Sequence, residues 1–76
     1  MSANSPEEEK IITVGGKSFT LNADIMVEID DGVIEKDWKI VTITSDGEKV
    51  IVYKEVDGNI LRKYVPIDEF LKLQNL

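Results

Sequence analysis

Six carboxylates gather between residues 24 and 37 of this 76-residue sequence, with one lysine among them. They are Asp24, Glu28, Asp30, Asp31, Glu35 and Asp37. Acids at this density can bind a cation, exchange protons as a pair, or attract a basic partner. The residues around them, and their spacing, decide among these chemistries.

The spacing does not fit a helix-loop-helix calcium site. That loop needs acids at positions 1, 3 and 5 and a glycine at position 6. With Gly32 at position 6, Asp31 is at position 5, but Ile29 and Val27 stand at positions 3 and 1. A looser site of carbonyls and carboxylates remains an alternative, and so does a solvated strand-and-loop edge without any ligand.

Catalytic chemistry has little support in the sequence. Histidine and cysteine are absent, which removes the commonest general base, the thiol nucleophile and the usual zinc ligands. A pair of catalytic acids needs a deep cleft, and so short a chain has little room for one. Residues 14–18 (VGGKS) match only the end of a phosphate-loop pattern, because Ile11 stands where its first glycine belongs. We therefore expect no enzyme activity, cofactor or metal.

Protein docking is the functional interpretation that the acids leave open. The net charge of −6 disfavours nucleic acid as a direct partner and favours a basic protein surface. Trp38 follows the acids directly; tryptophan is enriched at interface hot spots, although a core or barrel-mouth anchor is the alternative. The predicted partner-binding residues are Glu28, Asp30, Asp31, Glu35, Asp37, Trp38 and Tyr53.

The elements that must position these residues begin with a hairpin. Residues 10–14 and 17–21 flank Gly15 and Gly16, which predicts a two-residue turn with Ile12 facing Phe19. Residues 25–30 then alternate, with Ile25, Val27 and Ile29 on the buried side.

A three-stranded meander follows, with strands at 38–44, 48–56 and 59–65 and an Asp-Gly turn at each junction. A two-residue loop at 46–47 pairs residues as follows: Ile43 with Val50, Val41 with Val52, Ile40 with Tyr53, and Thr42 with Ile51. Both faces are apolar, so each needs a cover. Residues 66–76 supply one, a short helix with Ile67, Phe70 and Leu71 on one stripe.

These elements predict an all-β fold: a small SH3-like, partly open barrel of a two-stranded hairpin and a three-stranded meander, with one short C-terminal helix. The order is similar to that of chromodomain-like archaeal chromatin proteins, whose basic DNA-reading face is absent here. Residues 1–9 are expected to be a disordered acidic tail, and residues 10–76 a single domain. Without a readable signal peptide or membrane span, we expect a cytoplasmic protein.

The sequence thus favours a non-enzymatic protein-interaction module that acts as a small regulator or accessory subunit. The alternative is an acidic inhibitor, encoded by a virus or mobile element, that binds a nucleic-acid-processing enzyme by mimicking nucleic-acid charge. The apolar sheet faces also predict a weak homodimer, with Tyr53, Leu73 or Leu76 near its centre.

Overall fold

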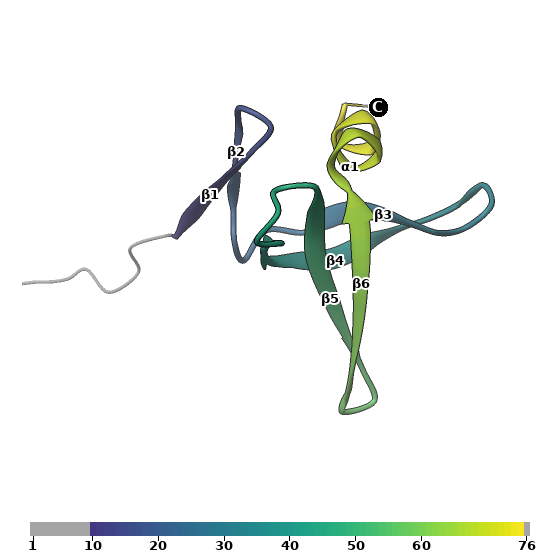
Figure 1. Ribbon diagram of the computed structural model, residues 1–76. Coiled ribbons are helices and arrows are strands. Elements are labelled where there is room, and N and C mark those ends of the chain that lie inside the picture. Colours follow the sequence, from purple (N-terminus) through teal and green to yellow (C-terminus); the bar gives the residue numbers. More distant parts are fainter. Residues whose placement is uncertain (1–9, 76) are drawn as a thin grey trace, which may run out of the picture.

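The computed structural model describes residues 10–75, so the expected tail at 1–9 lies outside the described residues. The elements are β1 (Ile11–Val14), β2 (Lys17–Thr20), β3 (Ile25–Asp30), β4 (Val33–Ile43), β5 (Lys49–Val56), β6 (Asn59–Pro66) and α1 (Ile67–Gln74) (Figure 1). Strands β1 and β2 form one antiparallel sheet, and β3 to β6 form another in sequence order. The mostly-β fold with one short C-terminal helix is as predicted, but the two sheets do not close into a barrel.

The first hairpin is confirmed. Ile12 pairs with Phe19, and the Leu21 amide donates to the Lys10 carbonyl at 2.9 Å. Gly15 and Gly16 take φ values of +58° and +84°, which a two-residue turn requires and which glycine adopts without steric cost.

The start of the meander was predicted wrongly. Strand β4 does not begin at Trp38; it extends from Val33 to Ile43 and pairs with β3 across the Asp31–Gly32 turn. Ile25 pairs with Trp38 but Val27 pairs with Glu35, so β4 carries one extra residue between these pairs. That bulge breaks the alternation of residues 33–38, and the segment therefore resembled a loop in the sequence.

A second bulge corrects the predicted register of β4 with β5. Ile43 pairs with Val50 and Thr42 with Ile51, as expected, but Ile40 pairs with Val52 and Lys39 with Tyr53. Val41 is the extra residue and is 43% exposed. The bulge moves Ile40 into the core, where it is 2% exposed.

The two Asp-Gly turns differ. Asp57 and Gly58, with φ values of +52° and +81°, form the two-residue turn expected between Val56 and Asn59. The β4–β5 loop is wider, because the Thr44 amide donates to the Lys49 carbonyl at 2.9 Å and residues 45–48 lie outside that pair. The register at Ile43 and Val50 is nevertheless the predicted one.

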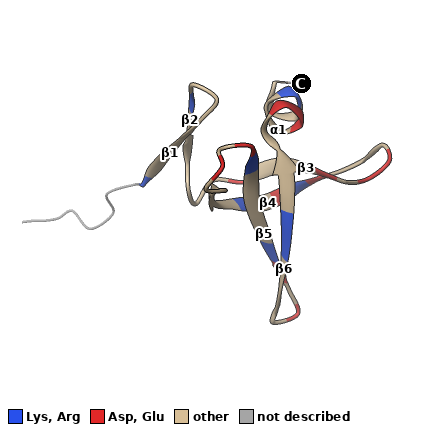
Figure 2. Ribbon diagram, in the orientation of Figure 1, with Lys and Arg blue, Asp and Glu red and all other residues tan. Residues whose placement is uncertain are grey.

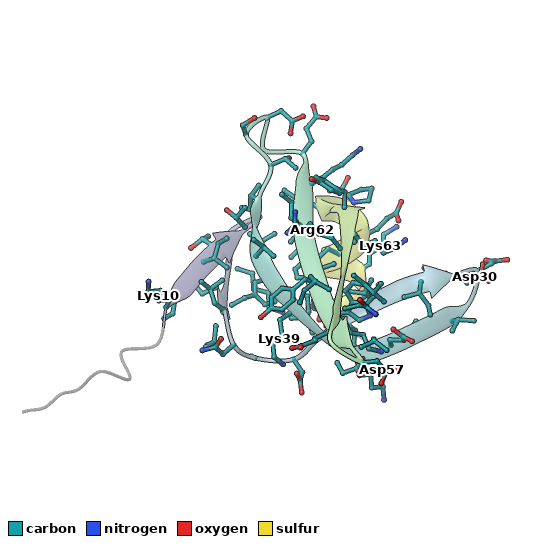
Figure 3. The ribbon with its side chains drawn as sticks, turned by 90° about the horizontal axis from the view of Figure 1, so that it is seen from below. Lys10, Asp30, Lys39, Asp57, Arg62 and Lys63 are labelled. Atoms are coloured by element: carbon teal, nitrogen blue, oxygen red, sulfur yellow. The ribbon has the colours of Figure 1, made fainter. Side chains whose placement is uncertain are left out.

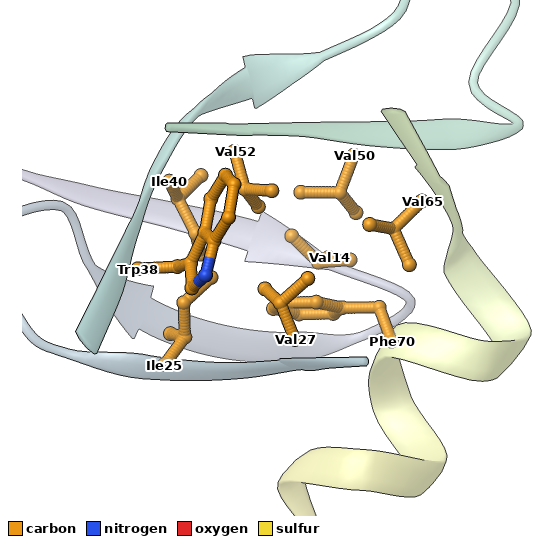
Figure 4. Packing of buried hydrophobic residues seen from close by; sticks show 9 residues of the cluster. All are labelled: Val14, Ile25, Val27, Trp38, Ile40, Val50, Val52, Val65 and Phe70. Carbon is orange, nitrogen blue, oxygen red and sulfur yellow. The ribbon is translucent and has the colours of Figure 1, made fainter. Parts of the chain in front are cut away.

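The core lies between the bent four-stranded sheet, the first hairpin and α1 (Figure 4). Its nine buried residues are Val14, Ile25, Val27, Trp38, Ile40, Val50, Val52, Val65 and Phe70. Phe70 is fully buried, with its ring centroid 5.2 Å from that of Phe19 in an edge-to-face arrangement. Burying a side chain of this size contributes roughly 1.5–3 kcal/mol. Phe70 is the fully buried residue of α1, and Ile67 and Leu71 pack beside it against the core.

The first hairpin and α1 cover only part of the inner face of the four-stranded sheet. Hairpins β3–β4 and β5–β6 both extend away from α1 and the first hairpin (Figure 1). Ile29 was expected to be buried with Ile25 and Val27, but it is 37% exposed. It is the extra residue of β3 between the Glu28–Ile34 and Asp30–Val33 pairs, so the alternation of residues 25–30 does not continue to it. Three of the predicted acidic residues, Glu28, Asp30 and Asp31, lie at the tip of the β3–β4 hairpin.

Candidate functional site

The inner face continues past the core into an open hollow between the two long hairpins, which we call the hairpin groove. Its volume is about 440 Å³. Its lining residues are Ile29, Glu35, Trp38, Lys54, Val56, Leu61, Arg62 and Lys63. Strand alternation explains four of these residues: Lys54 and Val56 follow the buried Val50 and Val52 on one side of β5, and Leu61 and Lys63 precede Val65 on the same side of β6. By the same alternation Arg62 belongs to the outer side of β6 and only borders the groove.

A charged cluster lies at the inner end of this groove. Trp38 Nε1 donates to Glu35 Oε1 at 2.8 Å, and Lys54 Nζ donates to the same oxygen at 3.1 Å. Lys54 Nζ also lies 3.2 Å from Asp37 Oδ1. The bulge in β4 allows this arrangement, because it turns Glu35 toward Trp38 on the inner side.

The cluster shifts the pKa of its members in opposite directions. The Trp38 hydrogen bond, followed by the Lys54 hydrogen bond, lowers the pKa of Glu35 below its ordinary 4.5. The Glu35 hydrogen bond, partly opposed by desolvation, raises the pKa of Lys54 above its ordinary 10.5. Glu35 is therefore an ionised structural acceptor near neutral pH, and it does not have the raised pKa of a general acid.

A second hollow lies where the outer edges of β3 and β6 face each other, and we call it the seam. It has a volume of about 350 Å³ and is bounded by residues 28–31 on one side, 63–66 on the other, and Glu69 and Leu73 of α1. Glu28 and Asp30 stabilise the hairpin tip, since Glu28 Oε2 accepts from the Gly32 amide at 2.9 Å and Asp30 Oδ1 accepts from the Asp31 amide at 2.8 Å. With Asp31, these residues place three acids on the β3 side of the seam, which we call its acidic bank.

A third, smaller hollow of about 210 Å³ lies beside β5 and is lined by Asp37, Lys39, Tyr53, Lys54 and Glu55. Lys39 Nζ donates to Asp24 Oδ1 at 2.6 Å, and this hydrogen bond raises the pKa of Lys39 above its ordinary 10.5. Asp24 and Asp37 are each within an ion pair, so the outer part of the acidic stretch is largely neutralised.

The seven predicted partner-binding residues are therefore distributed over three hollows. Glu28, Asp30 and Asp31 line the seam, Glu35 and Trp38 the hairpin groove, and Asp37 and Tyr53 the third hollow. Trp38 is 4% exposed, so it belongs to the core and contributes little accessible surface to the groove. Tyr53 and Leu73, expected near the centre of a homodimer, line different hollows.

Sequence reasoning missed the basic and apolar residues opposite the acids. Figure 2 shows acidic residues along the β3–β4 hairpin and basic residues on β5 and β6. Lys54, Leu61 and Lys63 complete the hairpin groove. Lys54 lies two residues after Val52, and Lys63 and Leu61 lie two and four residues before Val65. This even spacing was a usable signal, because strand residues two apart share a face.

Large apolar side chains are exposed on both hairpins that flank the groove. On β3 and β4 they are Ile29, Val33, Ile34 and Val41, and on β5 and β6 they are Val56, Ile60, Leu61 and Tyr64. On the two-stranded sheet, Ile11 is also exposed, at 64%. Three of these residues, Ile29, Val56 and Leu61, line the hairpin groove.

Within residues 10–75, no group of three or more acids is close enough to hold a metal ion. Over the same range, no helix has the length and apolarity needed to span a membrane. No family model, curated protein or solved structure matches the chain.

Proposed function

We propose that this chain is a non-enzymatic protein-interaction module that acts as a small regulator or accessory subunit. The observation that carries the proposal is the exposed apolar surface around the hairpin groove. Leu61 is 46% exposed and Val56 is 38% exposed. Both lie on the inner face of the four-stranded sheet, on which Val50, Val52 and Val65 are buried. Soluble proteins seldom leave such a surface uncovered unless it binds something.

The form of the groove also favours a protein partner. Its lining combines the aliphatic Ile29, Val56 and Leu61 with charged residues, and the Glu35–Lys54 pair lies at its inner end. Apolar contacts supply most of an interface's affinity, and a few charges fix its orientation. The acidic bank of the seam, formed by Glu28, Asp30 and Asp31, would meet a basic part of the partner.

The SH3-like arrangement belongs to this proposal. Both sheets and the helix contribute to one core, and the four-stranded sheet bends around it (Figure 4). In a partly open barrel of this kind, the open side is the uncovered end of the sheet, and the partner would bind there.

The alternative function, mimicry of nucleic-acid charge, has less support. Mimicry needs carboxylates spaced over a surface and free to meet the basic groove of an enzyme. Here Asp24, Glu35 and Asp37 are paired with lysines, which removes half of the acids in the stretch. The remaining three lie at a single hairpin tip.

The test is capture of a partner by the full-length chain as bait, followed by mass spectrometry, with two matched variants. Leu61→Asp places a charge in the groove, and Ile11→Asp places the same charge on the two-stranded sheet at a residue that is also exposed. A partner that binds the wild type and Ile11→Asp, but not Leu61→Asp, supports the proposal. Equal capture by all three baits, or none by the wild type, contradicts it.

A further inference from the structure

Strand β6 has an unpaired backbone edge. Val56 and Asn59 flank a two-residue turn and form a hydrogen-bonded pair, so Asn59, Leu61, Lys63 and Val65 bond to β5. By the same alternation, the backbone groups of Ile60, Arg62 and Tyr64 point away from β5. No other hydrogen bond reaches these three backbones within residues 10–75.

The opposite edge of the same sheet is protected. Gln74 of α1 binds the outer edge of β3 as a neighbouring strand would: the Met26 amide donates to Gln74 Oε1 at 3.1 Å, and Gln74 Nε2 donates to the Met26 carbonyl at 2.6 Å. The fold thus caps the outer edge of β3 at Met26, whereas no hydrogen bond in the described part of the chain caps the free groups of β6, although exposed edges invite unwanted pairing.

The open edge carries a distinct set of side chains. Ile60 and Tyr64 are each 55% exposed and flank Arg62 on the outer side of β6. Lys63 is the neighbouring charge on the inner side (Figure 3). Neither Arg62 nor Lys63 takes part in a salt bridge within the described part of the chain.

These charges disfavour a second copy of the chain as the occupant. Antiparallel pairing of two β6 edges that uses all three free residues places Arg62 opposite Arg62 of the other copy, with Ile60 opposite Tyr64. Like charges directly opposite each other destabilise a strand pair. A partner strand with a carboxylate at that position would replace this repulsion with a cross-strand ion pair.

We propose that β6 binds an extended segment of another protein as an added antiparallel strand, with an acidic residue opposite Arg62 and apolar residues opposite Ile60 and Tyr64. This inference rests on the proposed interaction function and specifies its mode of binding. Main-chain hydrogen bonds would provide affinity, and the alternating side chains would provide specificity. The seam, about 350 Å³ in volume, lies beside this edge and is lined on the β6 side by residues 63–66.

The experiment uses three nine-residue peptides in which threonine and valine alternate around a central residue. The first has a central glutamate and the second a central lysine. The third also has the central glutamate, but every second backbone amide is N-methylated and cannot donate a hydrogen bond. We expect the glutamate peptide to bind with a Kd on the order of 0.1–1 mM, because few hydrogen bonds and one charge pair contribute. Its binding should slow hydrogen exchange at the Ile60, Arg62 and Tyr64 amides. The lysine and N-methylated peptides should bind at least tenfold more weakly, and Arg62→Glu should reverse the charge preference. Absence of binding, equal binding of all peptides, or protection confined to other strands would overturn the proposal.

A pair of variants separates the backbone from the side chain. Tyr64→Pro and Tyr64→Thr both remove the ring, but only proline removes the outward amide donor, and an edge strand tolerates proline at such a position. We expect Tyr64→Pro to bind the glutamate peptide at least fivefold more weakly than Tyr64→Thr. If Tyr64→Pro does not fold, the exchange pattern of the wild-type chain still decides the question.

The same variants distinguish the failure of this inference from failure of the proposed function. If a captured partner is lost on Leu61→Asp but binds Tyr64→Pro and Tyr64→Thr equally, the interaction function stands and strand addition is wrong. If light scattering shows a wild-type dimer of twice the 8.6 kDa chain mass that Tyr64→Pro dissociates, the occupant is a second copy and the proposal is overturned.

Discussion

Glu35 has a structural role within its own chain that the sequence did not indicate. It was predicted to contact a partner, yet its carboxylate accepts hydrogen bonds from Trp38 and Lys54 of its own chain. Its side chain is 32% exposed and that of Lys54 is 19% exposed, so the pair closes the inner end of the groove. At this scale, the acidic stretch is partly a structural element.

The lowered pKa of Glu35 predicts a pH-dependent stability. A carboxyl whose pKa is lower in the folded state stabilises the fold fully above its unfolded pKa, and this contribution is lost as the pH falls through the folded pKa. The free energy of unfolding should therefore decrease as the pH is lowered below about 4.5. Glu35→Gln should reduce this dependence in denaturant titrations from pH 6 to 3. Glu55→Gln, at an exposed residue without a salt bridge among those described, serves as the control and should retain the wild-type slope.

Gln74 allows a second test at the residue scale. Gln74→Ala removes two hydrogen bonds from the edge of β3 and should lower the free energy of unfolding by about 1–3 kcal/mol, because part-buried backbone groups lose their partner. The Met26 amide should also exchange faster. Asn75→Ala, which removes only an exposed hydrogen bond from Lys17, should change stability by less than about 0.5 kcal/mol. Equal losses in both variants would show that Gln74 does not protect the edge.

At the scale of elements, the two-residue turns at Gly15–Gly16 and Asp57–Gly58 were predictable, whereas the wider β4–β5 loop and the bulges were not. Gly15–Gly16 and Asp57–Gly58 have the residue types that positive φ values require, so these hairpins could be predicted from local sequence. The bulges at residues 36–37 and at Val41 have no such local signature. Each is selected by packing on one face of the sheet, which explains why the strand start, the inward side of Ile40 and the role of Glu35 were missed.

The contact between the first hairpin and α1 depends on Gly15. A Cβ at this residue would lie 2.5 Å from Leu71 Cδ1, whereas a Cβ at Gly16 would meet no atom within 4 Å. Both residues have positive φ, so alanine at either is strained by about 1–2 kcal/mol. Gly15→Ala should cost roughly a further 1–2 kcal/mol, because Leu71 must move out of its packed position.

Thermal and chemical unfolding of the two glycine variants would measure this difference. The Gly16→Ala variant is the matched control, since it carries the backbone strain without the clash. A Gly15→Ala variant no less stable than Gly16→Ala would show that the hairpin does not rest on the helix as described.

At the scale of the whole molecule, charge is separated across the open side of the sheet. Acids lie at the β3–β4 tip, and Arg62 and Lys63 lie on β6 (Figure 3). Net charge was readable from the sequence, but this separation was not, because it depends on how the hairpins are placed. The mostly-β class, the first hairpin and the C-terminal helix were predictable; the open groove and the unpaired edge required the structure.

The acidic tip should accelerate association with a partner that presents a basic surface. Asp31→Lys should reduce the association rate constant by about three- to tenfold at low salt and weaken its salt dependence, with little effect on dissociation. Glu48→Lys makes the same charge change in the β4–β5 loop, away from the seam, and should have a much smaller effect. Surface plasmon resonance at two ionic strengths would compare them; equal effects would indicate that only net charge matters.

The central claim is that the uncovered end of the four-stranded sheet is a protein-binding surface. Hydrogen exchange measured by mass spectrometry, on the free chain and on its complex with a captured partner, tests this most directly. We predict slower exchange in residues 56–65 and 28–34, with no change in residues 11–20 of the two-stranded sheet. Protection confined to residues 11–20, or an unchanged pattern in a stable complex, would contradict the claim.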